Sequence, residues 1–314
     1  MSKFWNKTKN YFMQTDGIFW LISISISIFS LLLLLSVSRT SNFGYFRTQL
    51  IAIIIGYIGA FVITKSDYRI IAKHYIIVAT VCILLIVCTL IFGTSVTGNS
   101  GIDAKAWLKL PGGISFQPSE LAKIGFMITF SKHLSVLKEK NELKSFLNVA
   151  LLGVHALVPI ALNTGFQQIQ GKISIGSGKI FGQGLFNGPR VGSNSVPIQE
   201  SDFIFSVAGE ELGFIGCILV ILLLCLMLFR TLKIASLSSD CLGTCICFGF
   251  FGLVASQTIF NLGMCLSVLP VMGVTLPFFS AGGSSSACLY FGLGLIQSVF
   301  MQRHDDDINA IISE

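Results

Sequence analysis

Side chains that could do acid–base chemistry are scarce in this sequence. Fifteen Asp and Glu residues occur among 314 positions, and six of them lie in or beside the polar segments that separate long apolar blocks: Asp103, Glu120, Glu200, Asp202, Glu210 and Glu211. A carboxylate held against an apolar wall has a raised pKa, which suits it to act as a general base. Asp202 is followed by Phe203-Ile204-Phe205, so burial against this apolar stretch raises its pKa while the start of the next helix lowers it, and the sequence leaves the sign of the shift open. Because Asp is also a favoured helix N-cap, capping of the next helix is the alternative role.

Glu120 and Lys123 form a second candidate group. Their spacing of three residues puts both side chains on one face of a predicted helix, where they can pair. One interpretation is a neutralised ion pair that only joins two helices; the other is a polar cavity that holds an anionic headgroup. A charge that faces lipid costs about 2.5–3.5 kcal/mol on insertion scales, so we expect the pair to face the protein interior. For the same reason, at least one of Glu210 and Glu211 is expected to face protein or a cavity.

Other chemistries lack the residues that they need. The glycines between positions 176 and 188 do not form a nucleotide-binding loop, because Gly178-Lys179 is followed by Ile180 instead of Ser or Thr. The four His residues have no metal-binding spacing, and the nine Cys residues fall in or beside apolar segments, which indicates packing roles. The basic residues form no single patch, so nucleic acid is not an expected partner.

The elements that carry these residues are predicted to be membrane-spanning helices. The chain is 53% apolar and only 11% charged, with a mean hydropathy of +0.79, whereas soluble domains are about one-quarter charged. Apolar blocks of roughly 17 to 20 residues recur, which is the length that crosses a bilayer core. We therefore predict an all-α polytopic membrane protein with about eight transmembrane helices, at about 17–37, 46–64, 75–92, 119–133, 146–162, 205–229, 242–260 and 285–301.

The basic residues orient these spans. Most Lys and Arg residues lie in the short segments that share a side with the N-terminus, and the positive-inside rule then places both termini in the cytoplasm. Three long segments rich in Gly, Ser and Pro fall outside, at about 93–118, 163–204 and 261–284. The third is too apolar to lie in water, so we expect it to fold back into the protein at membrane depth. The whole chain, 1–314, is predicted to be a single integral membrane domain.

Three sequence blocks, one in each outside segment, form an ordered pattern. The first is Trp107 with Phe116-Gln117-Pro118-Ser119-Glu120-Leu121-Ala122-Lys123. The second is Ile175-Gly176-Ser177-Gly178 with Gly182 and Gly184, continuing through Pro197 and Asp202-Phe203-Ile204-Phe205 to Gly209-Glu210-Glu211-Leu212-Gly213. The third is Leu269-Pro270, Gly273, Leu276-Pro277-Phe278 and Ser280 to Ser285. Together the blocks resemble the SEDS family of bacterial cell-wall proteins, the FtsW, RodA and SpoVE group, over nearly the whole chain.

The resemblance implies a peptidoglycan glycosyltransferase that polymerises lipid II, an undecaprenyl-pyrophosphate-linked disaccharide-peptide, into glycan strands during cell division or elongation. The implied location is the outer face of the bacterial cytoplasmic membrane, which the chain crosses several times. The implied partners are a class B penicillin-binding protein, which is a transpeptidase, and membrane proteins of the divisome or elongasome. The residues around Thr275-Leu276-Pro277 slightly favour the FtsW-like branch over the elongation type.

The resemblance also implies site residues. Asp202 corresponds to the family's catalytic carboxylate. Lys123 and the amides of the Gly-rich segment, residues 176–188, are expected to stabilise the pyrophosphate as charge builds on it. The implied substrate-binding residues are Trp107, Gln117, Ser119, Glu120, Lys123, Gly176, Gly178, Glu210, Ser280, Gly282 and Gly283. No cofactor is implied with certainty, although a divalent cation could accompany the pyrophosphate.

The chain departs from the family pattern in one large respect. The family has ten spans and a Gln-Pro-Asp-Leu-Gly motif after the fifth, whereas here the fifth predicted span ends at Leu162 and the Gly-rich segment follows soon afterwards. Two spans and that motif are therefore expected to be missing, and the loss of an even number keeps every later block on its proper side. Two other functions stay open: a non-catalytic membrane scaffold that recruits a penicillin-binding protein, and a lipid II flippase.

Overall fold

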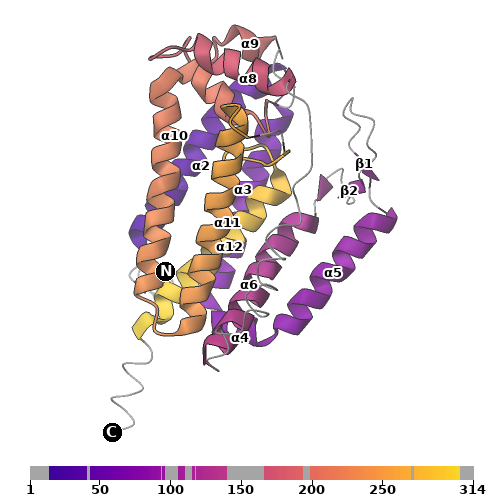
Figure 1. Cartoon of the computed structure of the whole chain (residues 1–314), viewed down its shortest axis with the longest axis vertical. Coiled ribbons are helices and arrows are strands. Elements are labelled where there is room, and N and C mark those ends of the chain that lie inside the picture. Colours follow the sequence, from indigo (N-terminus) through magenta and orange to yellow (C-terminus); the bar gives the residue numbers. More distant parts are fainter. Residues whose placement is uncertain are drawn as a thin grey trace, which may run out of the picture.

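A computed structural model describes residues 14–40, 43–92, 94–95, 105–109, 115–116, 118–139, 166–193, 199–269 and 272–304. These residues form an elongated bundle in which most helices run along the long axis (Figure 1). Within this part of the chain, five helices are long and apolar enough to cross a membrane: α2 (Gly17–Val37), α3 (Gly44–Lys65), α10 (Ile204–Ser236), α11 (Cys241–Cys265) and α12 (Gly283–Met301). The chain is a multi-pass membrane protein of the predicted all-helical class.

The predicted spans correspond closely to helices. α2 and α5 (Tyr75–Phe92) have the predicted bounds, and α3, α6 (Pro118–Glu139), α10, α11 and α12 each contain the range predicted for them. α10 continues past its predicted end at 229 to Ser236, because the prediction counted only the apolar span and charged residues such as Arg230 and Lys233 are good helix formers. The span predicted at 146–162 lies outside the described residues. The shorter helical elements are η1 (Ser38–Thr40), α4 (Tyr68–Lys73), α8 (Phe166–Ser177), α9 (Pro189–Gly192) and η3 (Gln302–His304).

The first outside segment contains a small antiparallel sheet between α5 and α6, with the strand order β1-β2-β3. β1 (Thr94–Ser95) pairs with β2 (Lys105–Lys109), and β2 pairs with β3 (Ser115–Phe116). Thr94 lies opposite Trp107 in the first of these pairings. The prediction for this segment, at about 93–118, was an outside loop. The strands are too short to show a periodic pattern, and their pairing supplies backbone hydrogen bonds to a segment that leaves the helical bundle.

α12 is almost entirely buried and packs along α3 through small residues. A Cβ added to Gly59 would lie 2.0 Å from Phe291 Cε1, and one added to Gly294 would lie 2.6 Å from the carbonyl oxygen of Ala60. Membrane helices have no hydrophobic drive to associate, so close approach over small residues is what holds such a pair together. The two helices provide the wall against which the third outside segment folds.

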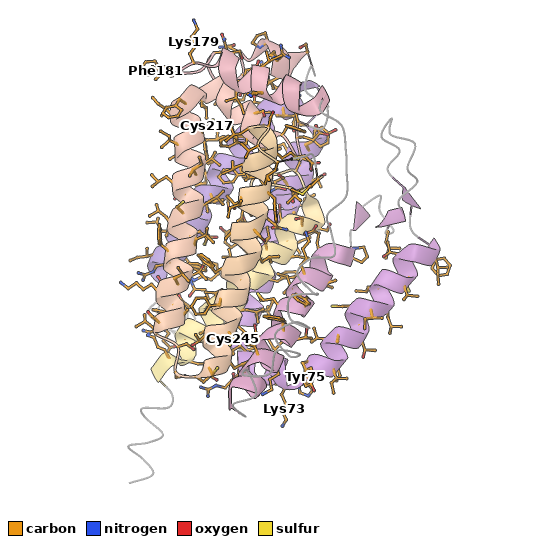
Figure 2. The ribbon with its side chains drawn as sticks, in the orientation of Figure 1. Lys73, Tyr75, Lys179, Phe181, Cys217 and Cys245 are labelled. Atoms are coloured by element: carbon orange, nitrogen blue, oxygen red, sulfur yellow. The ribbon has the colours of Figure 1, made fainter. Side chains whose placement is uncertain are left out.

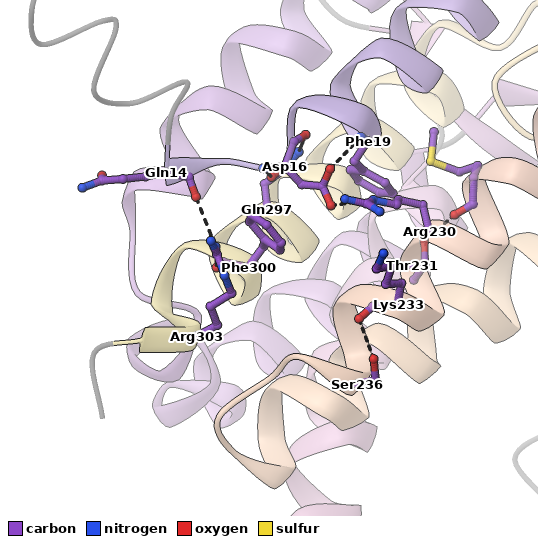
Figure 3. A network of polar contacts seen from close by, with 11 residues as sticks. Gln14, Asp16, Phe19, Arg230, Thr231, Lys233, Ser236, Gln297, Phe300 and Arg303 are labelled. Carbon is purple, nitrogen blue, oxygen red and sulfur yellow. Dashed lines mark hydrogen bonds and ion pairs between the residues drawn. The ribbon is translucent and has the colours of Figure 1, made fainter. Parts of the chain in front are cut away.

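A buried polar network, drawn in Figure 3, joins α2, α10 and α12 toward the lower end of the bundle as oriented in Figure 1. Asp16 caps α2 by accepting a hydrogen bond from the Phe19 amide at 3.0 Å, and it pairs with Arg230 Nε of α10 at 2.7 Å. Gln297 of α12 accepts a hydrogen bond from the Asp16 amide at 2.9 Å and donates one to the Asp16 carbonyl at 3.0 Å. Because each buried charge has a partner, the desolvation cost is offset.

The first and last described residues lie at this same lower end. Arg303 Nη1 donates a hydrogen bond to the Gln14 carbonyl at 3.4 Å. Lys73 also lies at the lower end, whereas Lys179 and Phe181 lie at the upper end (Figure 2). Both ends of the described chain are thus on one side of the bundle. That this side is cytoplasmic stays a prediction from the distribution of basic residues.

The third outside segment folds into the upper end of the bundle instead of extending away from it. Leu276, Phe278 and Phe279 are buried. Ser30 of α2 donates a hydrogen bond to the Phe279 carbonyl at 3.1 Å, and Gln49 of α3 donates one to the Phe278 carbonyl at 3.4 Å. Irregular backbone among apolar helices thus finds its hydrogen bonds inside the protein. The prediction that this segment returns into the protein is confirmed.

Candidate functional site

Asp202 lies immediately before α10, half-buried between two segments of the chain. Its Oδ1 accepts a hydrogen bond from Ser201 Oγ at 2.9 Å, and its Oδ2 faces Gly273, where an added Cβ would lie 3.8 Å away. The helix begins after Phe203 with no side-chain cap, so Asp202 does not have the alternative capping role. Burial raises the pKa of Asp202, the Ser201 hydrogen bond lowers it, and the charge of Glu200 raises it. The net rise suits a general base.

The backbone beside Asp202 is held by the third block. Ser280 Oγ donates a hydrogen bond to the Ser201 carbonyl at 2.6 Å, and the Ala281 amide donates one to the Glu200 carbonyl at 2.7 Å. The second and third blocks therefore form one site, although about 80 residues separate the partners. The hydroxyl of Ser280, predicted to contact substrate, acts in this structure on the backbone next to the carboxylate.

The predicted Glu120–Lys123 ion pair is present in the first turns of α6. Lys123 Nζ lies 2.8 Å from Glu120 Oε1, and Ser285 Oγ of α12 donates a hydrogen bond to Glu120 Oε2 at 3.0 Å. Glu120 is only 7% exposed, whereas the Lys123 side chain is 38% exposed. The carboxylate is thus anchored in the protein while the ammonium group stays accessible to an anion. These contacts also connect the first block to the third.

The Gly-rich segment packs directly on the start of α10, and its amides bond inside the protein. The Gly178 amide donates a hydrogen bond to the Ile175 carbonyl at 3.3 Å, and the Gly184 amide donates one to the Glu211 carbonyl at 3.0 Å. A Cβ added to Gly178 would lie 1.9 Å from the carbonyl oxygen of Gly209, so no other residue allows this contact between backbones. The expectation that these amides bind a pyrophosphate is wrong for Gly178 and Gly184, because both amides already have acceptors.

Glu210 and Glu211, near the start of α10, accept hydrogen bonds from the segments packed around them. Glu210 is fully buried, and its Oε1 accepts a hydrogen bond from the Arg190 amide at 2.7 Å while its Oε2 accepts one from Ser174 Oγ. Glu211 is also buried and accepts a hydrogen bond from Ser36 Oγ of α2. Both carboxylates therefore face protein, as expected for at least one of them. The contacts of Glu210 indicate that it shapes the loop, which differs from the substrate contact predicted for it.

Three further glycines were predicted to bind substrate: Gly282 and Gly283 at the start of α12, and Gly176 on α8. Gly282 is the N-cap residue of α12, and a Cβ added to the next residue, Gly283, would lie 3.0 Å from Thr48 Cγ2 of α3. Small residues here let the start of α12 approach α3. Gly176, on α8, is different because an added Cβ would meet no atom within 4 Å. Gly176 is therefore not required for packing, and its predicted contact with substrate stays a prediction.

The other predicted site residues are described only in part. Trp107 lies on β2 and Ser119 in the first turn of α6, but their side chains are outside the described part of the structure, as is the whole of Gln117. Among the described residues, no three His, Cys, Asp or Glu side chains lie close enough together to hold a metal ion.

Two buried amide side chains at the site were missed in the sequence. Gln49 of α3 and Asn261 of α11 are both fully buried. Gln49 Nε2 donates a hydrogen bond to Ser286 Oγ at 2.9 Å, and Asn261 Nδ2 donates one to the Asp202 carbonyl at 2.8 Å. The available signal was their position in apolar blocks, because a polar side chain inside a membrane helix is costly and usually has a specific partner.

Comparison with known proteins gives a consistent result. The family model of the FtsW, RodA and SpoVE proteins, described as "Cell cycle protein", matches residues 14–163 and 156–305. The chain is 27% identical over 357 residues to the "Probable peptidoglycan glycosyltransferase FtsW" of Geobacter metallireducens, which covers 90% of this chain and 94% of that protein. The crystal structure of the Thermus thermophilus rod shape determining protein RodA has a TM-score of 0.69 at 25% identity and covers 92% of this chain and 98% of that one.

A second solved structure has the same fold. It is described as "Structural coordination of polymerization and crosslinking by a peptidoglycan synthase complex", with a TM-score of 0.70 at 24% identity, covering 93% of this chain and 99% of that one. The alignment with the Geobacter metallireducens protein spans 357 positions, more than the 314 residues of this chain. That relative therefore contains residues without a counterpart here. The two family matches meet at residues 156–163, where the missing spans were predicted.

Proposed function

The chain belongs to the FtsW, RodA and SpoVE family of cell cycle proteins, and from that premise we propose that it is a peptidoglycan glycosyltransferase that polymerises lipid II with Asp202 as the general base. Curated relatives that share most of its length carry the glycosyltransferase name. We place the reaction at the outer face of the bacterial cytoplasmic membrane, because Asp202 precedes α10 at the end of the bundle that the basic residues predict to be outside.

The observation that carries this proposal is the convergence of the three sequence blocks. Ser280 of the third block donates a hydrogen bond to the carbonyl of Ser201, the residue before Asp202, and Ser285 of the same block donates one to Glu120 of the Glu120–Lys123 pair. One half-buried carboxylate with a raised pKa and one partly exposed ammonium group thus lie on a single connected scaffold. Transfer of a sugar from a pyrophosphate needs these two groups, a base for the acceptor and a cation for the leaving group.

The proposed reaction uses the two groups at opposite ends of the bond that changes. The Asp202 carboxylate accepts the proton of a sugar hydroxyl on one lipid-linked disaccharide, and the hydroxyl oxygen forms a bond to the anomeric carbon of the other. The bond between that carbon and the polyprenyl pyrophosphate breaks, and its electron pair leaves with the phosphate oxygen. Lys123 then stabilises the charge that builds on the pyrophosphate. A divalent cation bound with the pyrophosphate would add to the same stabilisation.

We further propose that the protein works beside a class B penicillin-binding protein within a divisome or elongasome assembly. The family resemblance implies such a transpeptidase. A structure with the same fold is described as coordinating polymerization and crosslinking in one complex, which is the arrangement proposed. The shortened segment after Leu162 does not remove any of the contacts that connect Asp202, Ser280, Ser285 and Glu120.

The test is polymerisation of lipid II by the purified full-length chain with a class B penicillin-binding protein encoded by the same genome. The expected product is glycan polymer, resolved on a gel, from the parent protein and not from Asp202→Asn. Transfer of the lipid II headgroup across a vesicle membrane without polymer would instead identify a flippase. Binding of the penicillin-binding protein with neither polymer nor transfer would identify a non-catalytic scaffold.

A further inference from the structure

Asn261 is a fully buried amide in the last turns of α11. Its Nδ2 donates two hydrogen bonds, one to the Asp202 carbonyl at 2.8 Å and one to the Val274 carbonyl at 2.7 Å. Its Oδ1 accepts a weak hydrogen bond from Cys265 Sγ at 3.7 Å. Because both acceptors of Nδ2 are carbonyl oxygens, only the NH2 end of the amide can face them, and the side chain has one possible orientation.

The two carbonyls belong to the two segments that flank the Asp202 carboxylate. Asp202 lies in the turn before α10, and Val274 follows Gly273, whose backbone faces Asp202 Oδ2. Gly273 has a φ of +61°, a conformation that glycine adopts without strain. A single amide therefore fixes the position of the carboxylate and the position of the loop opposite it at the same time.

The Asn261 contact completes a series along the chain before α10. Three successive carbonyls, those of Glu200, Ser201 and Asp202, each accept a hydrogen bond from the region that runs from α11 to the start of α12. The first two donors are the Ala281 amide and the Ser280 hydroxyl described above. Only the third donor holds the residue that carries the carboxylate.

We propose that Asn261 is a positioning residue for Asp202, which sets the reach of the carboxylate toward the acceptor hydroxyl by fixing its backbone and the Gly273–Val274 loop together. This inference rests on the proposed catalytic role of Asp202. Asn suits the task because a short amide supplies two N–H donors from one atom, whereas Ser, Thr or a protonated Asp supplies one and Leu supplies none. Catalytic groups must be held within about half an ångström of their working position, so loss of this anchor should slow the chemical step.

The experiment compares Asn261→Leu with Thr258→Val in the full chain, assayed for lipid II polymerisation with the partner transpeptidase. Thr258 is a matched control, because it lies one turn earlier on α11, is buried, and donates its hydrogen bond to the Val254 carbonyl of its own helix at 2.7 Å. Asn261→Leu should lower kcat by about 10- to 100-fold with KM changed less than about twofold. Thr258→Val should keep the parent kcat and KM.

The pH dependence of kcat separates positioning from general stability. The groups that face Asp202 are the Ser201 hydroxyl, the Glu200 carboxylate and, from α11, the Cys265 thiol, whose Sγ lies 3.6 Å from the Asp202 carbonyl. Displacement of the carboxylate changes its distance from Glu200 and its burial, so Asn261→Leu should shift the pH midpoint. A residue with a structural role only would lower the amount of folded protein and leave the midpoint per active molecule unchanged.

The outcomes distinguish this inference from the proposed function. If Asp202→Asn polymerises at the parent rate, the proposed role of Asp202 as general base is refuted, and the positioning role of Asn261 is refuted with it. If Asp202→Asn is inactive while Asn261→Leu keeps the parent kcat and pH midpoint, only the positioning role is refuted; equal losses in Asn261→Leu and Thr258→Val also refute it. Should Asn261→Leu not fold, Asn261→Asp, which keeps the shape and donates at most one hydrogen bond, is judged by the same kcat and pH readouts.

Discussion

Replacement of Asp202 by Asn removes the proposed base with little other change. Asn has the same shape, and its amide oxygen can still accept the hydrogen bond from Ser201 Oγ. The Asp202 side chain caps no helix, so no capping energy is lost. The Asp202 carbonyl keeps its hydrogen bond from Asn261. The substitution therefore separates the acid–base role of this side chain from its structural role.

The expected loss of activity follows from the chemistry of proton transfer. A positioned general base contributes about 100- to 10,000-fold to the rate, which corresponds to roughly 3–5 kcal/mol in the activation free energy. The expected change in the free energy of unfolding is below about 1 kcal/mol, because an isosteric change at a half-buried position opens no cavity and leaves no buried charge unpaired. Activity should thus fall by at least 100-fold in a protein that is as stable as its parent.

The pH dependence has a defined sign. Burial raises the pKa of Asp202 above its usual value near 4, and Glu200 adds to the rise. Because the base must be ionised, the parent rate should increase with pH through this raised pKa. The raised pKa also means that the folded state binds the proton more tightly than the unfolded state, so the stability contributed by the protonated carboxyl is lost as pH rises through the folded-state pKa. The stability of Asp202→Asn should therefore not fall with pH over this range.

Three measurements check the prediction. Gel analysis of glycan strands gives the polymerisation rate, thermal unfolding in detergent gives the stability, and the rate from pH 4 to pH 8 gives the midpoint. Glu200→Gln serves as the neighbouring control: it removes a negative charge beside Asp202 without removing the base, so it should keep activity and move the midpoint to lower pH. Parent-level polymerisation by a folded Asp202→Asn protein would refute the reasoning.

Three other predictions concern the ion pair, the Gly-rich segment and the orientation. Exchange of the pair (Glu120→Lys with Lys123→Glu) should preserve folding, because opposite charges still lie three residues apart, but should lower polymerisation about tenfold or more, because the accessible cation is lost. Gly213→Ala should cost about 2 kcal/mol or more in unfolding free energy, since φ is +66° and an added Cβ would lie 2.3 Å from the Gly182 amide nitrogen. A cysteine introduced at the exposed Ser193 should react with a membrane-impermeant reagent in intact cells.

Each of these predictions has a control and a contrary result. Full activity of the double exchange would make the ion pair structural only. Gly176→Ala is the control for the glycine, because an added Cβ there meets nothing within 4 Å and its stability should stay near that of the parent. For the orientation, a cysteine at Ser2 should label only after the cells are opened; the reverse pattern would invert the topology.

Local properties of the sequence were enough to predict the long apolar helices but not α8, which lies in the segment at 163–204 that was predicted to be an outside loop. α2 and α5 have the predicted bounds because the length of an apolar block and the polar residues at its ends are written in consecutive positions. The Glu120–Lys123 pair was predictable for the same reason, since residues three apart on a helix are neighbours whatever surrounds them. The β2 strand was not, because a strand this short shows no periodicity and forms only with its partners.

The role of the glycines was ambiguous in the sequence. A Gly-rich segment before a helix can bind an anion with its amides or can allow two backbones to touch, and composition is the same in both cases. In the structure, Gly178 allows two backbones to touch, because it lies against the Gly209 carbonyl. In the same way, the Glu210 carboxylate points inward and accepts a hydrogen bond from the Arg190 amide. The sequence around Glu210 had instead predicted a contact with substrate.

The sequence determined by itself that the chain crosses a membrane, which three blocks are candidates to carry its chemistry and that Asp202 is the candidate base. Only the tertiary structure decided that Ser280 and Asn261 hold the backbone at Asp202, and that Ser285 holds Glu120. The physical reason is range. Helix formation and pairing within one helix depend on residues a few positions apart, whereas these hydrogen bonds join residues 59 to 165 positions apart, and they exist only because the helices pack in one particular arrangement.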